Sequence, residues 1–122
     1  MNILVVEDHE DTRHVLAQVL SRKGFDVTTA DNVQDGLDLL RNKRFAAIVS
    51  DIMLPDGTGY GLMSEARRHG FDALAVALTA YGYPADVNEP KLTGFDYHLR
   101  KPIDCDRLVA ILETARASDD ER

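Results

Sequence analysis

The 122-residue sequence has little cysteine, and its single thiol, Cys105, cannot form an internal disulfide. This fits a reducing compartment, and no second Cys or nearby His stands at the spacing of a thiolate metal site. Long apolar runs are also missing. The first run, residues 2–6, is short and is followed directly by acidic residues. The sequence therefore predicts neither a secretion signal nor a membrane span, and we expect a cytoplasmic protein.

An excess of basic residues is absent as well. The chain has 14 Lys and Arg against 21 Asp and Glu, and its net charge is −7. Such a chain repels nucleic-acid phosphates and anionic lipid, so we expect neither nucleic acid nor membrane as a direct partner. Repeats and linkers are lacking too, and the length suits one domain with one core. We expect this domain over residues 1–118, with a short polar tail over 119–122.

Five short runs predict β-strands. The first, third and fourth are almost continuously apolar, which is typical of strands covered on both faces. The second run is mixed and indicates an edge strand, and the fifth is assigned partly from its place in the alternation. In order, the five runs are Asn2–Val6, Asp26–Ala30, Ala46–Ser50, Ala73–Leu78 and Asp96–Leu99.

Between the runs, apolar residues at spacings of three and four predict amphipathic helices. Asn32 and Asp104 are suitable N-caps, while Gly24 and Gly70 are suitable helix stops. The alternation of strand and helix predicts a doubly wound α/β sheet with parallel strands and right-handed crossovers.

The fourth helix, expected between Pro84 and Thr93, has an unfavourable sequence. Pro90 would remove a hydrogen bond from its interior at a cost of ~3 kcal/mol. We therefore expect this helix to be short, kinked or broken near Glu89.

Chemically active side chains follow four of the predicted strands: Glu7 and Asp8 the first, Asp51 the third, Thr79 the fourth and Lys101 the fifth. Ligands of such sheets bind at the carboxyl ends of the strands. Acids on neighbouring strands ~4.8 Å apart repel one another unless a cation lies between them. Oxygen ligands favour Mg²⁺ before Ca²⁺, and a carboxylate beside a metal and a lysine suits phosphoryl transfer. The residues alone leave open whether Asp51 is a cap, a metal ligand, a base or a nucleophile.

Four segments together resemble response regulator receiver domains of two-component phosphorelays, of the single-domain type and similar to the receivers of hybrid histidine kinases. They read ILVVEDHED, SDIMLPDGTGY, ALTAYG and GFDYHLRKPID, and they cover the chain from Asn2 to about Ala117. The resemblance implies a flavodoxin-like fold, in which a five-stranded parallel sheet of order 2-1-3-4-5 is flanked by five helices.

The resemblance also implies a role for each residue at the strand ends. Asp51 matches the aspartate that accepts the phosphoryl group, Thr79 the hydroxyl that binds it, and Lys101 the phosphate-binding lysine. Glu7 and Asp8 match the acidic pair that holds Mg²⁺. Glu7 departs from the family, which usually has aspartate at that position, and its extra methylene is expected to preserve a water-mediated contact.

Further expectations follow from the same resemblance. The backbone carbonyl of Met53 matches the remaining Mg²⁺ ligand, alongside the carboxylates, and a cis bond is expected at Lys101–Pro102. Pro55, Gly57 and Gly59 are expected to shape the loop through which phosphate and Mg²⁺ approach.

The family's switch residue, three positions before the lysine, is His98 here instead of Tyr or Phe. His98 together with Thr79 is the expected switch, although a passive, half-buried histidine is an equally good interpretation. The implied partners are a histidine kinase or histidine phosphotransfer domain and a downstream target protein, with the receiver as a monomer or weak dimer. The resemblance implies a signalling domain that hydrolyses its aspartyl phosphate slowly, not a turnover enzyme.

Other functions fit the sequence less well. A phosphatase of the haloacid dehalogenase type needs a second acid two residues after the first, where this chain has Met53. A flavodoxin-like FMN carrier needs a Ser/Thr/Gly-rich loop where this chain has EDHED, and the GxxxxGK of a P-loop is absent. A degenerate receiver that binds proteins without phosphorylation, or a phosphate sink, remains the alternative.

Overall fold

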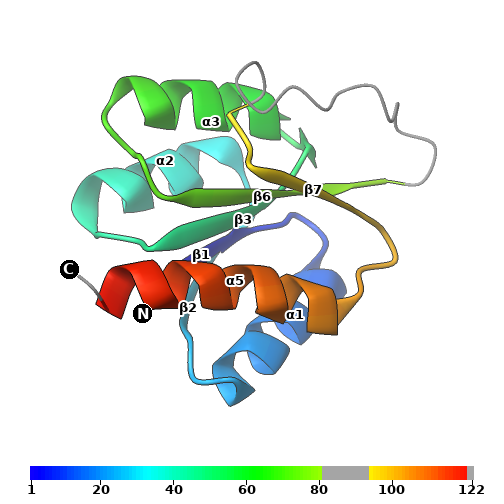
Figure 1. The fold of residues 1–122 in the computed structure, drawn as a ribbon. Helices are drawn as coiled ribbons and strands as arrows, with labels where there is room; N and C mark the ends of the chain where they lie inside the picture. The colour runs from blue at the N-terminus through cyan, green and yellow to red at the C-terminus, as the bar shows by residue number, and fades with distance from the viewer. Residues whose placement is uncertain (81–93, 121–122) are drawn as a thin grey trace.

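The computed structural model describes the backbone of residues 1–80 and 94–120, and the side chains of these residues except 117–120. A parallel five-stranded sheet lies between two layers of helices (Figure 1). The sheet has the order β2-β1-β3-β6-β7. Its strands are β1 (Asn2–Val6), β2 (Asp26–Ala30), β3 (Ala47–Asp51), β6 (Leu74–Thr79) and β7 (Tyr97–Arg100).

Four helices lie within the described residues. Figure 1 shows α2 and α3 on one face of the sheet and α1 and α5 on the other. Their bounds are α1 (Glu10–Arg22), α2 (Val33–Asn42), α3 (Gly59–Arg68) and α5 (Cys105–Asp120). The fourth helix that the sequence indicates, between Pro84 and Thr93, falls outside the described residues.

The helix boundaries follow the capping residues in the sequence. The Asn32 side chain accepts a hydrogen bond from the backbone of Asp35, and Asp104 accepts two from the first turn of α5. Gly24 and Gly70 follow α1 and α3 with φ angles of 90° and 95°, a region that glycine enters without steric cost. These four predicted caps and stops are confirmed.

The strand predictions are confirmed with small shifts. The runs at 2–6 and 26–30 have the expected bounds, whereas the other three strands begin and end one residue later than predicted. Asp51 and Thr79 are therefore the last residues of β3 and β6 instead of the first residues after them. The sequence prediction also lacked a short antiparallel hairpin, β4 (Met53–Leu54) with β5 (Gly57–Thr58), between β3 and α3.

The core has one half on each face of the sheet. Leu16, Leu20 and Leu112 belong to the half under α1 and α5, and Leu62 and Met63 belong to the half under α2 and α3. All five residues of β3 are buried, as its apolar run predicts for a central strand covered on both faces. This packing fixes the strand ends, and hence the side chains that emerge from them.

Among the described residues, none of the helices combines the length and the apolar character that a membrane crossing requires. Helix α5 continues to Asp120. The boundary between a domain over 1–118 and a tail over 119–122 stays a prediction.

Candidate metal and phosphate site

The carboxyl ends of β1, β3 and β6 bring the predicted site residues to one edge of the sheet. Val6 pairs with Ser50, and Asp51 pairs with Leu78. Glu7 follows β1, and Thr79 is the residue after Leu78, so both lie beside Asp51. Parallel strands that end in register therefore place side chains from three distant segments in one site.

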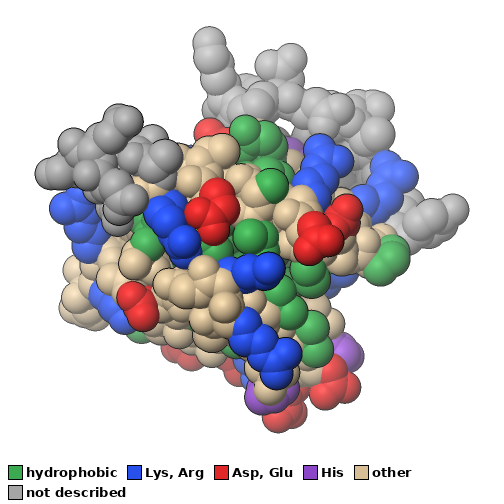
Figure 2. All heavy atoms as spheres, turned by 60° about the horizontal axis from the view of Figure 1, so that its bottom comes forward, with side chains coloured by type: hydrophobic (Ala, Val, Ile, Leu, Met, Phe, Trp, Pro, Cys, Tyr) green, Lys and Arg blue, Asp and Glu red, His purple; other side chains and the backbone are tan. Residues whose placement is uncertain are grey.

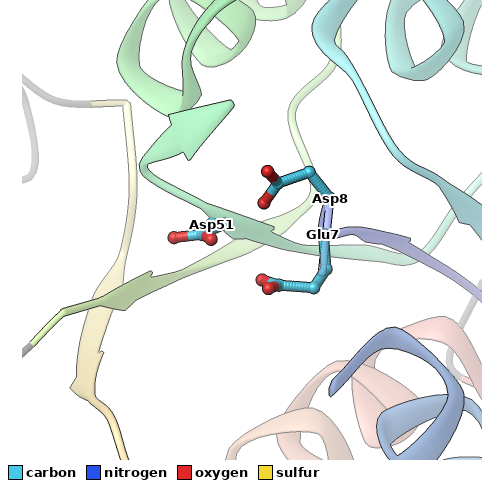
Figure 3. A group of neighbouring side chains, drawn as sticks. All are labelled: Glu7, Asp8 and Asp51. Carbon is cyan, nitrogen blue, oxygen red and sulfur yellow. The ribbon is translucent and has the colours of Figure 1, made fainter. Parts of the chain in front are cut away.

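Three carboxylates cluster at this edge. Oxygens of Glu7, Asp8 and Asp51 all lie within 4.8 Å of one another, and Figure 3 shows the three side chains extending from the ends of β1 and β3. Asp8 is exposed, whereas the Glu7 side chain is 0% exposed and the Asp51 side chain is 10% exposed. Buried carboxylates this close together require positive charge nearby.

Lys101 supplies one such charge. Its Nζ lies 3.1 Å from Oδ2 of Asp51 and 3.3 Å from both carboxylate oxygens of Glu7. The backbone N–H of Lys101 donates to the carbonyl of Thr79 at 2.7 Å, which ties the lysine to the end of β6. The bond from Lys101 to Pro102 is cis, as expected.

The single lysine does not balance all three acids. Burial, and after it the nearby carboxylate of Asp51, raises the pKa of Glu7 to about 7, and Lys101 only partly opposes these two effects. Burial lowers the pKa of Lys101, but its hydrogen bond and charge interactions with Asp51 and Glu7 outweigh burial and raise it. Near neutral pH, the Glu7 carboxylate therefore binds a proton part of the time. A second cation bound at this edge would displace that proton.

Tight backbone packing holds the candidate nucleophile. Oδ1 of Asp51 accepts a hydrogen bond from the N–H of Ile52 at 2.8 Å, which leaves Oδ2 toward Lys101. The N–H of Gly59 donates to the carbonyl of Ile52 at 2.7 Å, and a Cβ at Gly59 would clash with the carbonyl of Asp51. Only glycine fits there, which agrees with the expectation that Gly59 shapes this loop.

Asp56 joins the loop to a neighbouring helix. Its carboxylate accepts hydrogen bonds from the backbone of Val33 at 2.7 Å and Gln34 at 3.1 Å, at the N-terminus of α2. These backbone hydrogen bonds lower the pKa of Asp56. The sequence does not reveal this contact, because the capped helix begins more than twenty residues before Asp56.

Thr79 and His98 lie on the neighbouring strands β6 and β7. Thr79 is 7% exposed, and its hydroxyl donates to the carbonyl of Leu99 at 3.4 Å. The His98 ring contacts those of Phe95 and Tyr60 at centroid distances of 5.9 and 6.4 Å. Nε2 of His98 is buried and has no hydrogen-bond partner among the described residues, and burial lowers the pKa of this imidazole.

Arg13 supports the backbone of the site, and the sequence does not predict this role. Its guanidinium donates to the carbonyl of Glu7 at 3.0 Å and to that of Asp8 at 3.4 Å. Arg13 thereby fixes the backbone that carries both acids. A basic residue one turn into the helix that follows the acidic pair is a weak signal, because such residues are common on exposed helix faces.

A groove beside the site exposes apolar surface. It has a volume of about 360 Å³ and is lined by Val15 and Leu16 of α1, by Ile103 and Cys105, and by Lys101 of the site itself. Val15 is 52% exposed. Figure 2 shows hydrophobic side chains emerging between charged ones on the face formed by α1 and α5.

The donor set fits a hard divalent cation. Carboxylate oxygens from three residues converge, and neither Cys nor His belongs to the cluster. Burial and the charge of Asp51 raise the pKa of Glu7 to about 7, which leaves room for a further positive charge at this edge. Mg²⁺, which binds through one or two carboxylates and keeps several waters, suits this arrangement.

Comparisons with known proteins agree with this geometry. A family model described as the response regulator receiver domain matches residues 3–113. An uncharacterized 14.6 kDa protein in the sodA1 3′ region of Leptolyngbya boryana is 36% identical over 115 residues, covering 93% of this chain and 88% of that protein. The sensor histidine kinase RcsC of Salmonella typhi is 32% identical over 112 residues, covering 92% of this chain but only 12% of the kinase.

Solved structures share the fold. TrrA from Thermotoga maritima, a response regulator protein determined in complex with Mg²⁺-BeF, superimposes with a TM-score of 0.82 at 24% identity. The match covers 93% of this chain and 97% of that one. At this identity the likeness shows the architecture alone.

Proposed function

The chain belongs to the response regulator receiver domain family, a family of signalling domains, and from that membership we propose that Asp51 accepts a phosphoryl group from a phosphohistidine in a Mg²⁺-dependent reaction. The observation that carries the proposal is the contact of Lys101 with both Asp51 and Glu7 at the edge where the three carboxylates meet. The donor is a histidine kinase or a histidine phosphotransfer domain. In this proposal the protein acts in the cytoplasm.

In the proposed reaction, a carboxylate oxygen of Asp51 attacks the phosphorus. The bond between phosphorus and the donor imidazole breaks, and its electron pair leaves with the imidazole nitrogen, which is protonated. Lys101, 3.1 Å from Oδ2 of Asp51, offsets the charge of the phosphoryl oxygens, and the Thr79 hydroxyl donates to one of them. Water later cleaves the aspartyl phosphate, which restores the carboxylate and releases phosphate.

Glu7, Asp8, Asp51 and the carbonyl of Met53 would hold Mg²⁺. The ion would neutralise charge on the phosphoryl oxygens while Asp51 attacks. The chain itself contributes a buried Glu7, whose length brings its carboxylate to Lys101, and an exposed Asp8, which faces the solvent from which the ion arrives.

Phosphorylation would switch the surface near β7. It adds a charge of about −1 to −2 beside Thr79 and Lys101. Thr79 would turn from the carbonyl of Leu99 toward the phosphoryl group, and His98 would repack beside Phe95 and Tyr60. Burial lowers the pKa of His98, which favours the neutral ring in this apolar cluster.

The His98 switch is testable by NMR titration of its imidazole with and without Mg²⁺ and beryllofluoride, a phosphate mimic. We expect the pKa and the ring chemical shifts of His98 to differ between the two states, because its burial changes. His14, an exposed histidine on α1, serves as the control, and its ring signals should not differ between the two states. Identical values for His98 in both states would leave it the passive half-buried histidine of the alternative interpretation.

The groove at Val15 would receive the phosphodonor. It begins at Lys101, so a protein seated on α1 can bring a phosphohistidine to Asp51 while covering apolar surface. We expect Val15→Glu to slow phosphotransfer from a phosphorylated histidine phosphotransfer domain about tenfold, because a charge enters the centre of the contact. Labelling by acetyl phosphate should be unchanged. Gln18→Glu, on an exposed position of the same helix, is the control, and equal slowing in both variants would contradict this docking face.

Intact-mass measurement tests the proposed function itself. Incubation of the wild type with Mg²⁺ and acetyl phosphate should give a labile adduct of ~80 Da, which is absent in Asp51→Asn and is not formed when EDTA removes the metal. A wild type that no competent donor labels would instead favour the degenerate receiver, which binds partners without phosphorylation. Labelling without any change in the surface around His98 would favour a phosphate sink.

A further inference from the structure

A second cavity lies at the opposite edge of the sheet from the carboxylates. It has a volume of about 660 Å³ and opens between the C-terminal ends of α2 and α3, where the chain turns into β3 and β6. Figure 1 shows these two turns on the same side of the molecule. Ala47 and Leu74 begin the strands that Asp51 and Thr79 end. The cavity is therefore separate from the phosphoryl site, and its occupation does not depend on the function proposed above.

Apolar side chains of the core form part of the lining of this cavity. Leu37 and Leu40 of α2 contribute to it together with Phe71, and all three are only partly covered by the rest of the core. Phe45 also lines the cavity and is 4% exposed. A volume in the range of ligand pockets, about 300–1,000 Å³, combined with incompletely covered leucine and phenylalanine, leaves apolar area for a partner to bury.

The rim of the cavity is basic, although the chain carries a net charge of −7. Arg41, Lys43, Arg44 and His69 line it, and Asp72 is the acid among the lining residues. Like-charged groups gathered on an oppositely charged molecule produce a local field that attracts acidic partners.

Helix capping explains only part of this basic rim. Arg41 lies in the last turn of α2, where cations are favourable, and its guanidinium is 3.4 Å from Asp38. Lys43 follows the helix, reaches the hydroxyl of Thr28 at 3.1 Å and lies over the Phe45 ring at 5.6 Å. The exposed Arg44 guanidinium has neither a hydrogen bond nor an ion pair with any residue that the structure describes.

We propose that this basic pocket, lined by Leu37, Leu40, Arg41, Arg44 and Phe71, binds a short segment of another protein in which one apolar side chain is flanked by carboxylates. The apolar side chain would cover Phe71 and the leucines, and the carboxylates would pair with Arg41 and Arg44. An apolar centre with an exposed charged rim is the anatomy of a protein interface. Small-molecule sites instead place polar groups inside the pocket, and here the charged groups stand at its edge.

Peptide selection tests the proposal without knowledge of the natural partner. Random peptides displayed on phage are selected against the wild type, against the double variant Arg41→Glu/Arg44→Glu, and against Arg22→Glu. Arg22 is an exposed basic residue at the end of α1, on the other face of the sheet, and its reversal is the control for a change of charge away from the pocket. We expect the wild type and Arg22→Glu to enrich peptides with an aromatic or Leu residue between acids, and the double variant to lose them.

An enriched peptide is then measured by NMR and fluorescence anisotropy. Binding should shift the amides of Leu37, Phe71 and Ala73, and should weaken about tenfold or more in the double variant and at high salt. Arg44→Ala, which adds no charge at the helix end, repeats the measurement if the double variant does not fold.

Three outcomes would overturn the proposal. Selection could yield no acidic peptides, the double variant could enrich the same ones, or the shifts could map to the α1 face. Saturable binding of octanoate at the pocket without any peptide binding would assign it to a small amphipathic anion. Dimerisation of the wild type that Arg41→Glu/Arg44→Glu abolishes would assign it to a second copy of this acidic chain.

Discussion

Glu7 stands where the receivers that this sequence resembles usually have aspartate, and its greater length has a consequence. The carboxylate reaches Lys101 with both oxygens at 3.3 Å while it remains 0% exposed. Burial and the charge of Asp51 bring its pKa to about 7, so the side chain is close to half protonated at neutral pH. A metal ion that needs this carboxylate must compete with a proton.

Mg²⁺ binding should therefore release protons. With a pKa of about 7 for Glu7, we expect roughly half a proton per ion at pH 7 and close to none at pH 9. Calorimetric titrations in buffers of different ionisation enthalpy measure the number directly. Glu7→Gln, which cannot release this proton, should bind Mg²⁺ more weakly with little release at either pH. Equal release from both proteins would place the titrating group elsewhere.

At the residue scale, the sequence predicts which side chains come together, but it does not predict which acids Lys101 contacts or how the pKa of each group changes. Glu7, Asp8, Asp51 and Lys101 stand at strand ends, and the parallel sheet alone brings them together. The shared contact of Lys101 with two acids depends on side-chain length and rotamer, which no pattern of residues encodes. Met53 as a metal ligand, and Thr79 and His98 as the switch, stay predictions.

At the element scale, Arg67 connects three segments that the sequence leaves separate. Its guanidinium, on α3, donates to the carbonyls of Phe71 and Ala73 in the turn before β6 and to that of Gly94 before β7. It also lies over the Phe71 ring at 5.3 Å. One side chain thus satisfies three backbone acceptors that have to be paired where they are partly buried.

Replacing Arg67 should cost more stability than replacing its neighbour. We expect Arg67→Met, which keeps an unbranched apolar stem but leaves these carbonyls without a donor, to lower the free energy of unfolding by roughly 1–3 kcal/mol. Arg68→Met removes an exposed guanidinium paired with Glu65 and should cost under ~0.5 kcal/mol. Urea unfolding of the two variants makes the comparison, and equal costs would contradict the bridging role of Arg67.

The elements themselves follow from the sequence to different degrees. Continuous apolar runs predict β1, β3 and β6, because full burial on both faces demands continuous hydrophobicity. The edge strands β2 and β7 have mixed sequences, and the prediction of β7 depended partly on its place in the alternation. The hairpin of β4 and β5 escapes prediction, since its strands have two residues each and it is held by Asp56 at the N-terminus of α2 and by Gly59 against Asp51. Long-range contacts of this kind leave no periodic signal.

For the molecule as a whole, the alternation of elements indicates a doubly wound sheet, while the strand order came from the resemblance to receivers. The observed order, β2-β1-β3-β6-β7, places two cores on opposite faces and both proposed binding regions on opposite edges. The cluster of Glu7, Asp8 and Asp51 lowers the stability of the folded protein, because like charges that are close together and partly buried repel one another. The apo protein should therefore carry a stability deficit that depends on pH.

The sign of that dependence follows from Glu7. Its pKa is about 7 in the folded protein and 4.5 without the fold, so the folded state binds the additional proton between these values. The stability that Glu7 contributes is then fully present below pH 4.5 and is lost as the pH rises through 7. The wild type in EDTA should lose on the order of 2 kcal/mol relative to Glu7→Gln between pH 5 and 8.

Mg²⁺ should reverse this trend, because it binds the deprotonated carboxylates of the folded state alone. A concentration of 100 times its dissociation constant would add ~2.7 kcal/mol to the free energy of unfolding, and the gain should grow as the pH rises and Glu7 loses its proton.

Burial lowers the pKa of His98 and so favours stability at higher pH, but this contribution is common to the wild type and Glu7→Gln and cancels in their difference. Urea unfolding of both proteins at several pH values, with EDTA or with Mg²⁺, gives the four curves. If the unfolding free energies of the two proteins in EDTA change with pH in parallel, Glu7 does not take up a proton on folding, and its pKa is not raised in the folded protein.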